Sequence, residues 1–303
     1  MNIIFLGTPE FSVPSLQAII TAGFNIVAVV TAPDKPAGRG MKMQSSAVKL
    51  FATAHQIPVL QPTKLKDPKF IETLKSYKAD VQVVIAFRML PEAVWNMPPK
   101  GTINLHASLL PDYRGAAPIN WAIINGETKT GVSTFLLKHE IDTGDLIMTE
   151  QVAITSQMNA GELHDLLKNI GARIIVETLK KIETGNYIAI PQPFNSEKIA
   201  PKIFAEYCKI DWQQPAKVIC NKIKGLAPYP GATTIFDEKM LKVFKADYIL
   251  ENSNIEAGKM ITDDKTFIKF KCKDGFVNIL EIQLEGKKRM FVDIFLRGFK
   301  TLN

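Results

Sequence analysis

Short apolar runs alternate with helix-like segments along the first half of the chain. The runs lie at residues 2–7 (NIIFLG), 25–31 (NIVAVVT), 81–86 (VQVVIA) and 102–106, and the segments between them include 67–77 and 91–96. Nearly continuous apolar runs of this length predict strands that are buried on both faces. Their alternation with helices predicts a doubly wound, mainly parallel, Rossmann-like α/β sheet.

The pattern then predicts a strand pair at 131–137 and 145–154, flanking the turn IDTGD at 141–145. A long helix is expected over about residues 159–183, with Asn159 as its N-cap and Gly185 beyond its end. Residues 190–202 contain three prolines and little periodicity, as in a linker that crosses a surface.

Beyond one short helix at 215–224, the chain reads as short strands separated by Asp, Asn, Lys and Gly turns. This spacing predicts a small β-barrel or sandwich, and a five-stranded OB-like barrel fits the length. OB-like barrels often bind nucleic acid. We therefore predict an α/β domain at residues 1–189, a linker at 190–205 and an OB-like domain at 206–303.

The composition narrows the class of protein. Hydrophobic residues make up 46% and charged residues 22%, as in soluble globular proteins. No apolar run approaches the about 18 residues of a membrane span, and the N-terminus lacks signal-peptide features. The three cysteines have neither metal spacing nor even pairing, which suits a reducing cytosol. The net charge of +7 permits a polyanionic partner without requiring one.

The most informative polar residues are Asn104 and His106, which alternate along a strand and so share one face. Asp142 follows 36 residues after His106 and can orient its imidazole. An amide, an imidazole and a carboxylate suit a site that holds an oxyanion and moves one proton. If the nucleophile belongs to the substrate, the pattern favours acyl-type transfer. Taken alone, the residues equally allow a satisfied half-buried histidine, and a β-turn explains Asp142.

Two further segments have a functional and a simpler interpretation. GTPE at residues 7–10 occupies the place of a nucleotide-binding turn, but it is not GxGxxG, and a tight strand-to-helix turn explains it better. Residues 33–49 form a long, basic, Gly/Pro-rich segment that could grip a phosphate backbone or be a solvated loop. The basic residues considered are Lys35, Arg39, Lys42 and Lys49 here, and Lys287, Lys288 and Arg289 in a late turn.

Longer segments of the chain resemble the methionyl-tRNA formyltransferase family over essentially the whole length. They are IIFLGTPEFSVPSL, DKPAGRG, NLHASLLPDYRGAAPINWAIINGE, IDTGD, IKGLAPYPGA and GKKRMFVDIFLRG. Two pairs depart from the family pattern. Phe87-Arg88 stands where an aromatic residue followed by glycine is expected, and Asp112-Tyr113 where a basic–aromatic pair is commoner.

The resemblance implies a formyltransferase fold with a C-terminal tRNA-binding domain and a role in translation initiation. It implies 10-formyltetrahydrofolate as formyl donor, initiator methionyl-tRNA as acceptor and no metal. Asn104 and His106 would donate hydrogen bonds to the oxyanion, with Asp142 as proton partner. The folate would contact Phe87, Arg88, Met89, Leu90, Ser108, Leu109, Leu110, Pro111, Glu140 and Ile141. The tRNA would contact the seven basic residues named above, with the 33–49 loop near the weak first base pair of the acceptor stem.

Three alternatives stay open at this level. A folate-dependent formyltransferase could act on a small amine such as a purine precursor or an amino sugar. A formyl-folate hydrolase would use water instead of the amine. A non-catalytic RNA-binding module would use only the second domain. We expect a cytoplasmic monomer with no membrane association.

Overall fold

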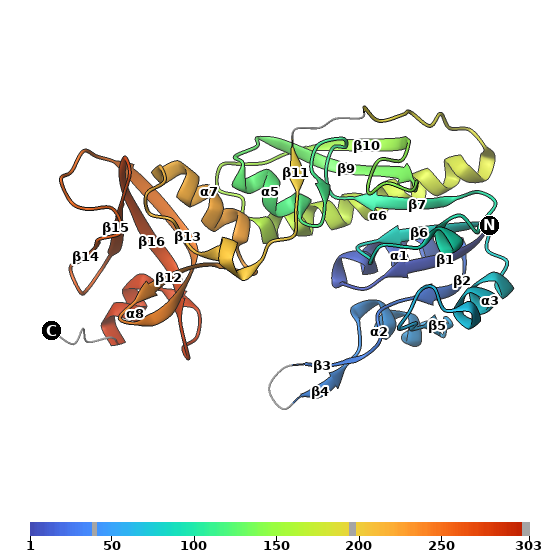
Figure 1. Cartoon of the computed structure of the whole chain (residues 1–303), viewed down its shortest axis with the longest axis horizontal. Coiled ribbons are helices and arrows are strands. Elements are labelled where there is room, and N and C mark those ends of the chain that lie inside the picture. The colour runs from blue at the N-terminus through green and yellow to red at the C-terminus, as the bar shows by residue number, and fades with distance from the viewer. Residues whose placement is uncertain (38–40, 194–197, 299–303) are drawn as a thin grey trace. The chain divides into compact units, whose positions relative to one another are not determined.

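The computed structural model describes residues 1–37, 41–193 and 198–298, and the chain forms two compact units. Unit 1 comprises Met1–Gly115, Gly131–Val152 and His164–Ile199, and unit 2 comprises Ala116–Thr130, Ala153–Leu163 and Ala200–Asn303 (Figure 1). Unit 2 therefore includes two segments that precede residue 189 in the sequence. The predicted division at residues 189 and 206 stays a prediction.

Unit 1 is built on a seven-stranded sheet with the order β10-β9-β7-β6-β1-β2-β5. The strands are β1 (Asn2–Gly7), β2 (Asn25–Val30), β5 (Val59–Leu60), β6 (Val81–Ile85), β7 (Thr102–His106), β9 (Lys129–Leu136) and β10 (Leu146–Ala153). The five neighbouring strands β7, β6, β1, β2 and β5 run parallel to one another, and β9 is antiparallel to β7. After β1 the chain adds β2 and β5 on one side of β1, and it then adds β6, β7, β9 and β10 on the other side. The strand order thus reverses between β1 and β6, where open α/β sheets bind ligands.

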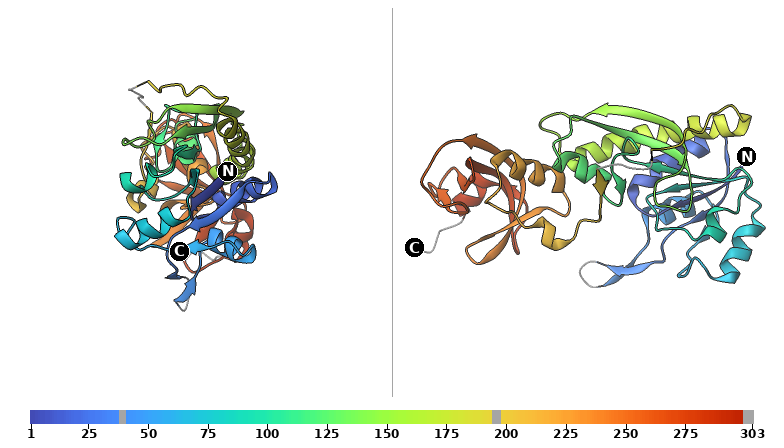
Figure 2. Two further views of the ribbon diagram at one scale, coloured as in Figure 1. Left: turned by 90° about the vertical axis from the view of Figure 1, so that its right-hand side faces the viewer. Right: turned by 45° about the horizontal axis from the view of Figure 1, so that its top comes forward.

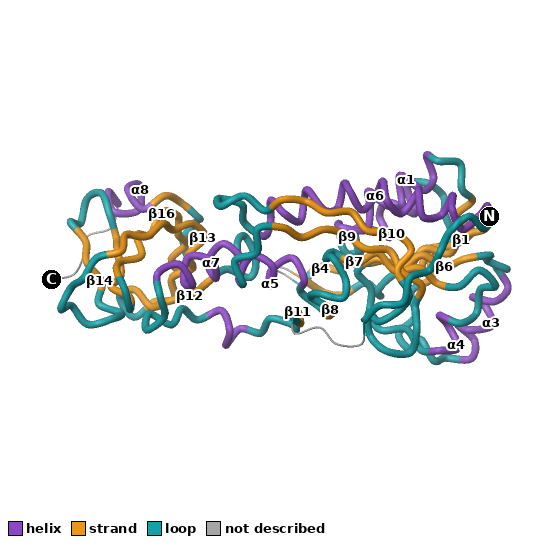
Figure 3. Tube along the Cα trace, turned by 90° about the horizontal axis from the view of Figure 1, so that it is seen from above, coloured by secondary structure: helices purple, strands orange, loops and turns teal. Residues whose placement is uncertain are grey.

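Helices cover both faces of this sheet, with α1 and α6 on one face and α3 and α4 on the other (Figure 3). The helical elements of unit 1 are η1 (Glu10–Ser12), α1 (Val13–Thr21), α2 (Ala47–Ala54), α3 (Pro68–Ser76), α4 (Glu92–Trp95) and most of α6 (Ala160–Thr184), whereas α5 (Pro118–Ile124) belongs to unit 2. Ile4 and Leu6 of β1 are fully buried with Phe70 of α3 and Val94 of α4 in one core cluster. The doubly wound sheet predicted from the apolar runs is confirmed.

Helix α6 begins where its cap residues predict. The Glu162 N–H donates to Asn159 Oδ1 over 3.0 Å, and the Asn159 N–H donates to Glu162 Oε2 over 2.9 Å. This reciprocal pair is a capping box that satisfies two otherwise orphaned N–H groups. Gly185, at φ +71, follows the last turn, as expected of a C-terminal glycine.

The basic 33–49 segment contains regular structure that the sequence analysis did not anticipate. Strands β3 (Lys35–Ala37) and β4 (Lys42–Gln44) pair antiparallel as a short ladder. Ser46 then caps α2 by accepting the Lys49 N–H. Arg39 lies outside the described residues. A second short ladder joins β8 (Arg114–Gly115) and β11 (Ile199–Ala200).

Unit 2 contains a six-stranded antiparallel sheet that curls into a half-barrel (Figure 2). Its strands are β12 (Ala232–Phe236), β13 (Lys239–Leu250), β14 (Met260–Thr262), β15 (Ile268–Cys272), β16 (Gly275–Leu284) and β17 (Met290–Phe291). Its other elements are η2 (Ala205–Cys208), α7 (Ala216–Leu226) and α8 (Val292–Gly298). Register shifts in β13 at Lys245 increase the local bend of the sheet. The predicted small β domain after the Rossmann-like sheet is confirmed.

The sequence analysis did not anticipate helix α8 (Val292–Gly298). Val292, Phe295 and Leu296 fall at helical spacing and are buried in the core of unit 2. Apolar residues at this spacing form one buried face of a helix. In the described part of the chain, no helix is both long and apolar enough to cross a membrane.

Candidate active site

Asn104 and His106 lie near the carboxyl end of β7, beside the point where the strand order reverses. Asn104 pairs in register with Val84 of β6 and Phe135 of β9, so parallel and antiparallel neighbours hold its strand from both sides. Asn104 is half-buried, and His106 is 7% exposed. Two residues apart on one strand, they share a face as predicted.

Asp142 lies in the turn between β9 and β10 and is brought against His106. Its Oδ2 lies 3.8 Å from His106 Nδ1 and accepts the Gly115 N–H over 3.0 Å. Only 9% of Asp142 is exposed. A separation of 3.8 Å is an ion-pair distance and not a direct hydrogen bond, so the backbone of Gly115 is what holds this carboxylate.

The other ring nitrogen of His106 has a defined partner. Nε2 lies 2.8 Å from the carbonyl oxygen of Tyr113. A carbonyl oxygen only accepts, so Nε2 carries a proton. In the neutral ring, Nδ1 then bears the lone pair and faces Asp142.

The side-chain amide of Asn104, in contrast, makes no hydrogen bond with any part of the chain that the structure describes. Asn104 can therefore donate to a ligand without first breaking a bond within the protein.

Three non-glycine residues with positive φ lie in the loops at this edge. They are Ala86 after β6 (φ 48), Tyr113 in the loop after β7 (φ 61) and Asp142 (φ 55). Each such backbone costs on the order of 1–3 kcal/mol, and such residues concentrate at functional sites. Two of the three hold His106 or face it, which favours a functional explanation over a plain turn.

The turn at 108–112 is held by its own hydrogen bonds. Ser108 Oγ donates to the Asp112 carbonyl over 2.6 Å, while Ser133 Oγ accepts the Leu110 N–H and donates to the Ser108 carbonyl. Ser108 and Leu110 are buried, and Leu109 and Pro111 are half-buried. The hydroxyl of Ser108 therefore serves the turn, and Ser133 is a supporting residue that the sequence analysis missed.

The 87–90 loop, which follows β6, the strand paired with β7, offers apolar surface. Met89 is 72% exposed, Phe87 is half-buried and Leu90 is buried. Arg88 donates to the carbonyl oxygens of Pro62 and Thr63, and its guanidinium lies 5.7 Å from the centre of the Phe87 ring. Arg88 thus ties the loop to the segment that follows β5.

The 138–144 loop borders a cavity of about 360 Å³. Glu140 and Ile141, two of the predicted folate contacts, are exposed on this loop. The cavity is lined by Arg114, Lys138, His139, Glu140, Thr143, Gln192 and Pro193. The sequence analysis singled out neither Arg114 nor Gln192. Arg114 stands inside the quoted DYRG segment, whereas Gln192 lies in a stretch interpreted as a linker.

The predicted tRNA contacts fall in two groups. In unit 1, Lys35 is exposed on β3, and Lys49 donates to Asp34 over 2.5 Å. That bond is the main reason why the pKa of Asp34 lies below its ordinary value. Lys42 belongs to β4, and only its backbone is described.

In unit 2, Lys287 and Lys288 are exposed in the turn between β16 and β17. Arg289 forms a bidentate pair with Glu281 over 2.8 and 2.6 Å, and its guanidinium lies 4.3 Å from the centre of the Phe244 ring. Of these three basic residues, Arg289 is therefore already engaged.

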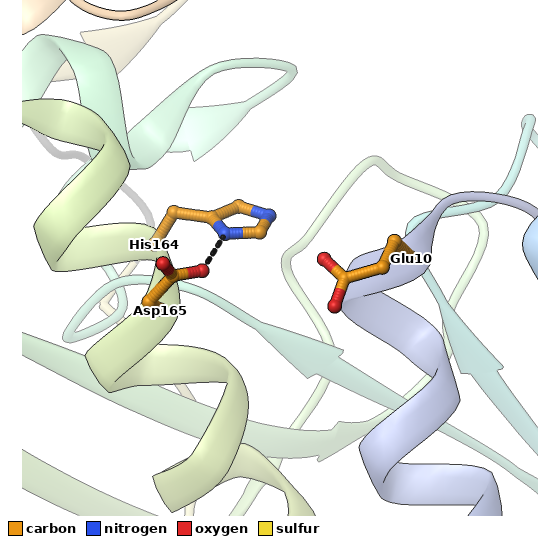
Figure 4. Close-up of side chains that lie close together, drawn as sticks. All are labelled: Glu10, His164 and Asp165. Carbon is orange, nitrogen blue, oxygen red and sulfur yellow. Dashed lines mark hydrogen bonds and ion pairs between the residues drawn. The ribbon is translucent and has the colours of Figure 1, made fainter.

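A separate cluster in unit 1 joins Glu10 of η1 to His164 and Asp165 of α6 (Figure 4). Lys168 contacts the Glu10 carboxylate at 2.8 Å and the Asp165 carboxylate at 3.0 Å. The hydrogen bond to Glu10 is the main cause of a raised pKa of Lys168, and the bond from Lys168 is the main cause of a lowered pKa of Asp165. A lysine ammonium already pairs with both carboxylates, so the cluster is an ion-pair network between η1 and α6.

Comparison with known proteins identifies the family of the chain. Residues 1–179 match the family model described as formyl transferase, and residues 202–300 match the formyl transferase C-terminal domain. The methionyl-tRNA formyltransferase of Bacteroides fragilis is 49% identical over 308 residues, covering 99% of this chain and 95% of the relative. That of Flavobacterium johnsoniae is 51% identical over 303 residues, covering 98% and 96%.

Two solved structures with similar folds are more distant in sequence. A sugar 3N-formyl transferase, WlaRD, determined with dTDP and 5-N-formyl-THF, superposes with a TM-score of 0.68 at 21% identity, covering 95% of this chain and 99% of that one. HypX from Aquifex aeolicus with tetrahydrofolic acid gives a TM-score of 0.65 at 20% identity, covering 97% and 46%. These structures support the fold. The family models and the full-length relatives together show that the chain belongs to the methionyl-tRNA formyltransferase family.

Proposed function

We propose that the protein transfers the formyl group of 10-formyltetrahydrofolate to the α-amino group of methionine on initiator methionyl-tRNA, for translation initiation. The observation that carries this proposal is the grouping of Asn104, His106 and Asp142 at the switch-point edge of the sheet. It occurs in a chain that is about half identical to methionyl-tRNA formyltransferases over nearly its whole length.

The residues beside this group suit a folate. A pteridine ring needs apolar walls and a few well-placed polar groups. Phe87, Met89 and Ile141 offer apolar surface, and Met89 and Ile141 are unusually exposed for such side chains. We propose that the folate lies across 87–90, the 108–111 turn and residues 140–141, with Arg88 shaping the loop rather than contacting the ring.

The bound folate supplies a formyl group to the attacking amine. In our proposal Asn104 donates its amide hydrogen bond to the formyl oxygen, where negative charge develops. One such donor typically contributes about 10²–10³ in rate. Its lack of a partner among the described residues fits this task, because no internal bond must be broken first.

His106 and Asp142 handle the proton that leaves the amine. Because Nε2 is already protonated and donates to Tyr113, Nδ1 is the position of His106 that can accept a proton. Asp142 would stabilise the imidazolium from 3.8 Å away. The ring could then donate Nδ1–H to the oxyanion and finally pass the proton to N10 as the carbon–N10 bond breaks.

For tRNA we propose contacts from Lys35, Arg39, Lys42, Lys49, Lys287, Lys288 and Arg289. Phosphate contacts of this type give affinity that falls with salt. Lys49 and Arg289 would have to exchange the carboxylates of Asp34 and Glu281 for phosphates, so we expect smaller contributions from them. We further propose a cytoplasmic monomer without a catalytic metal, to be tested by light scattering and by activity after chelation.

The proposal is tested by two parallel reactions with purified protein and 10-formyltetrahydrofolate. One receives methionylated initiator tRNA and the other methionylated elongator tRNA, and N-formylmethionine is quantified. Formylation of the initiator alone is the expected result. Folate turnover without formylated tRNA would instead support a small-amine transferase or a hydrolase.

A further inference from the structure

The side-chain amide of Gln192 joins the 142–144 turn, which contains Asp142, to Arg114 in the loop after β7. Its Nε2 donates to the Asp142 carbonyl over 3.0 Å and to the Gly144 carbonyl over 2.7 Å. Its Oε1 accepts from Arg114 Nε over 3.2 Å and from Arg114 Nη2 over 2.7 Å. An amide side chain offers two N–H donors and two acceptor lone pairs, so Gln192 is fully satisfied.

The two loops joined in this way are those that place the Asp142 carboxylate. On one side, Nε2 of Gln192 holds the backbone at both ends of the 142–144 turn. On the other side, Oε1 holds Arg114, whose neighbour Gly115 donates its N–H to Asp142 Oδ2. The Gln192 side chain therefore holds the Asp142 backbone directly and the Asp142 carboxylate indirectly, through Arg114 and Gly115.

The segment that carries Gln192 is itself fixed to the sheet. Leu146 of β10 and Ile190 exchange two backbone hydrogen bonds of 2.8 Å in an antiparallel bridge. Arg114 Nη2 also donates to the Pro193 carbonyl over 3.0 Å. Residues on either side of Gln192 are thus held, so its amide has a defined position from which to act.

We propose that Gln192 is a positioning residue for formyl transfer, acting through Asp142. This inference rests on the proposed function, in which Asp142 faces the proton-accepting nitrogen of His106. Asp142 has a left-handed backbone, at φ +55, and its carboxylate lies beyond hydrogen-bond distance of Nδ1. With the His106 contact this long, the loop contacts rather than a direct bond determine where the carboxylate lies.

The test replaces Gln192 by Met, which keeps the length of the side chain and removes all four hydrogen bonds. A second variant, Gln192→Glu, keeps an acceptor for Arg114 but loses both N–H donors. Misplacement of a catalytic group by a supporting residue costs on the order of 10- to 100-fold in rate. We expect kcat to fall by about that factor in both variants, with KM for folate and tRNA within about twofold. Gln17→Met is the control, because Gln17 is exposed on α1 and bonds only locally to Thr21.

The decisive measurement repeats Gln192→Met in an Asp142→Asn background, with single-turnover rates at excess enzyme. If Gln192 acts through Asp142, its substitution should cost less than about twofold there. The same loss in both backgrounds, or no loss in the wild-type background, would overturn the inference. A wild-type rate for Asp142→Asn itself would reject the proposed role of Asp142, and the inference with it. A normal rate for Gln192→Met beside a slow Asp142→Asn would reject the inference alone.

Discussion

The hydrogen bond from His106 Nε2 to the carbonyl oxygen of Tyr113 determines which nitrogen of the ring faces Asp142 with a lone pair. Tyr113 reaches this position with a backbone at φ +61, on the chain that leads directly to Gly115, which holds the carboxylate. Residues 113–115 thus contact both members of the pair through main-chain atoms. The ring and the carboxylate are aligned by one short segment.

Replacing His106 by Ala should lower kcat by about a hundredfold or more, because both the proton acceptor and a donor to the oxyanion are lost. His55→Ala is the control, since His55 is exposed at the end of α2 and should have no effect. Turnover is measured as formylation of initiator methionyl-tRNA, and folding is measured by circular dichroism. Near-normal turnover of a folded His106→Ala variant would reject its assignment.

Replacing Arg88 by Gly restores the residue type expected in the family and removes two hydrogen bonds to the carbonyls of Pro62 and Thr63. The 87–90 loop should then be less restrained, and KM for the folate should rise by about threefold to tenfold with kcat little changed. Lys64→Gly, a change at an exposed neighbouring position, controls for loss of charge and for added backbone freedom. An unchanged KM would show that the loop keeps its form without Arg88.

Replacing Lys288 by Ala should reduce the salt dependence of tRNA binding. If Lys288 contacts one phosphate, the slope of log K against log salt concentration should become shallower by about 0.7 to 0.9. Arg289→Ala should change it less, because Glu281 and Phe244 already engage that guanidinium. Filter binding at several salt concentrations measures the slopes. A Lys288→Ala slope identical to that of the wild type would exclude this contact.

Cys220 should be unreactive towards thiol reagents in the folded protein. Burial raises the pKa of the Cys220 thiol to about 12, and only the thiolate is nucleophilic. Native protein at pH 8 should therefore leave Cys220 unlabelled by iodoacetamide, while denatured protein should label it fully. Mass spectrometry of the peptide distinguishes the two results, and rapid labelling of the native protein would contradict the prediction.

The same shift links Cys220 to stability at high pH. The folded-state pKa lies above the unfolded-state value, so folding favours the protonated thiol. Its contribution is complete below the unfolded pKa, near 9, and is lost as the pH rises towards 12. The stability difference between the wild type and Cys220→Ala should therefore narrow above about pH 9 in denaturant melts.

Patterns that depend on local periodicity were readable from the sequence. The apolar strands β1, β2, β6 and β7 and the Asn159 cap of α6 follow from side-chain spacing alone. Helix α8 was missed because its buried residues are few and follow a basic turn. Spacing singled out Asn104, His106 and Asp142, and the resemblance to a family implied their catalytic roles, although their geometry required the fold.

The supporting contacts could not be predicted for a physical reason. Tyr113 and Gly115 act through backbone atoms, which leave no mark on residue type. Gln192 acts from a segment without periodicity, 50 residues from Asp142 in the chain. Such contacts depend on where loops meet in space, and no local pattern encodes this.

Gly144 illustrates how tolerance to substitution differs from chemical participation. A Cβ built at this position would lie 1.6 Å from the Leu136 carbonyl oxygen, within the hairpin that presents Asp142. In a saturation library selected for growth, position 144 should therefore be depleted as strongly as position 142, although glycine has no functional group. A map of mutational intolerance would place the two residues in one class, and only variants assayed for both folding and turnover would separate them.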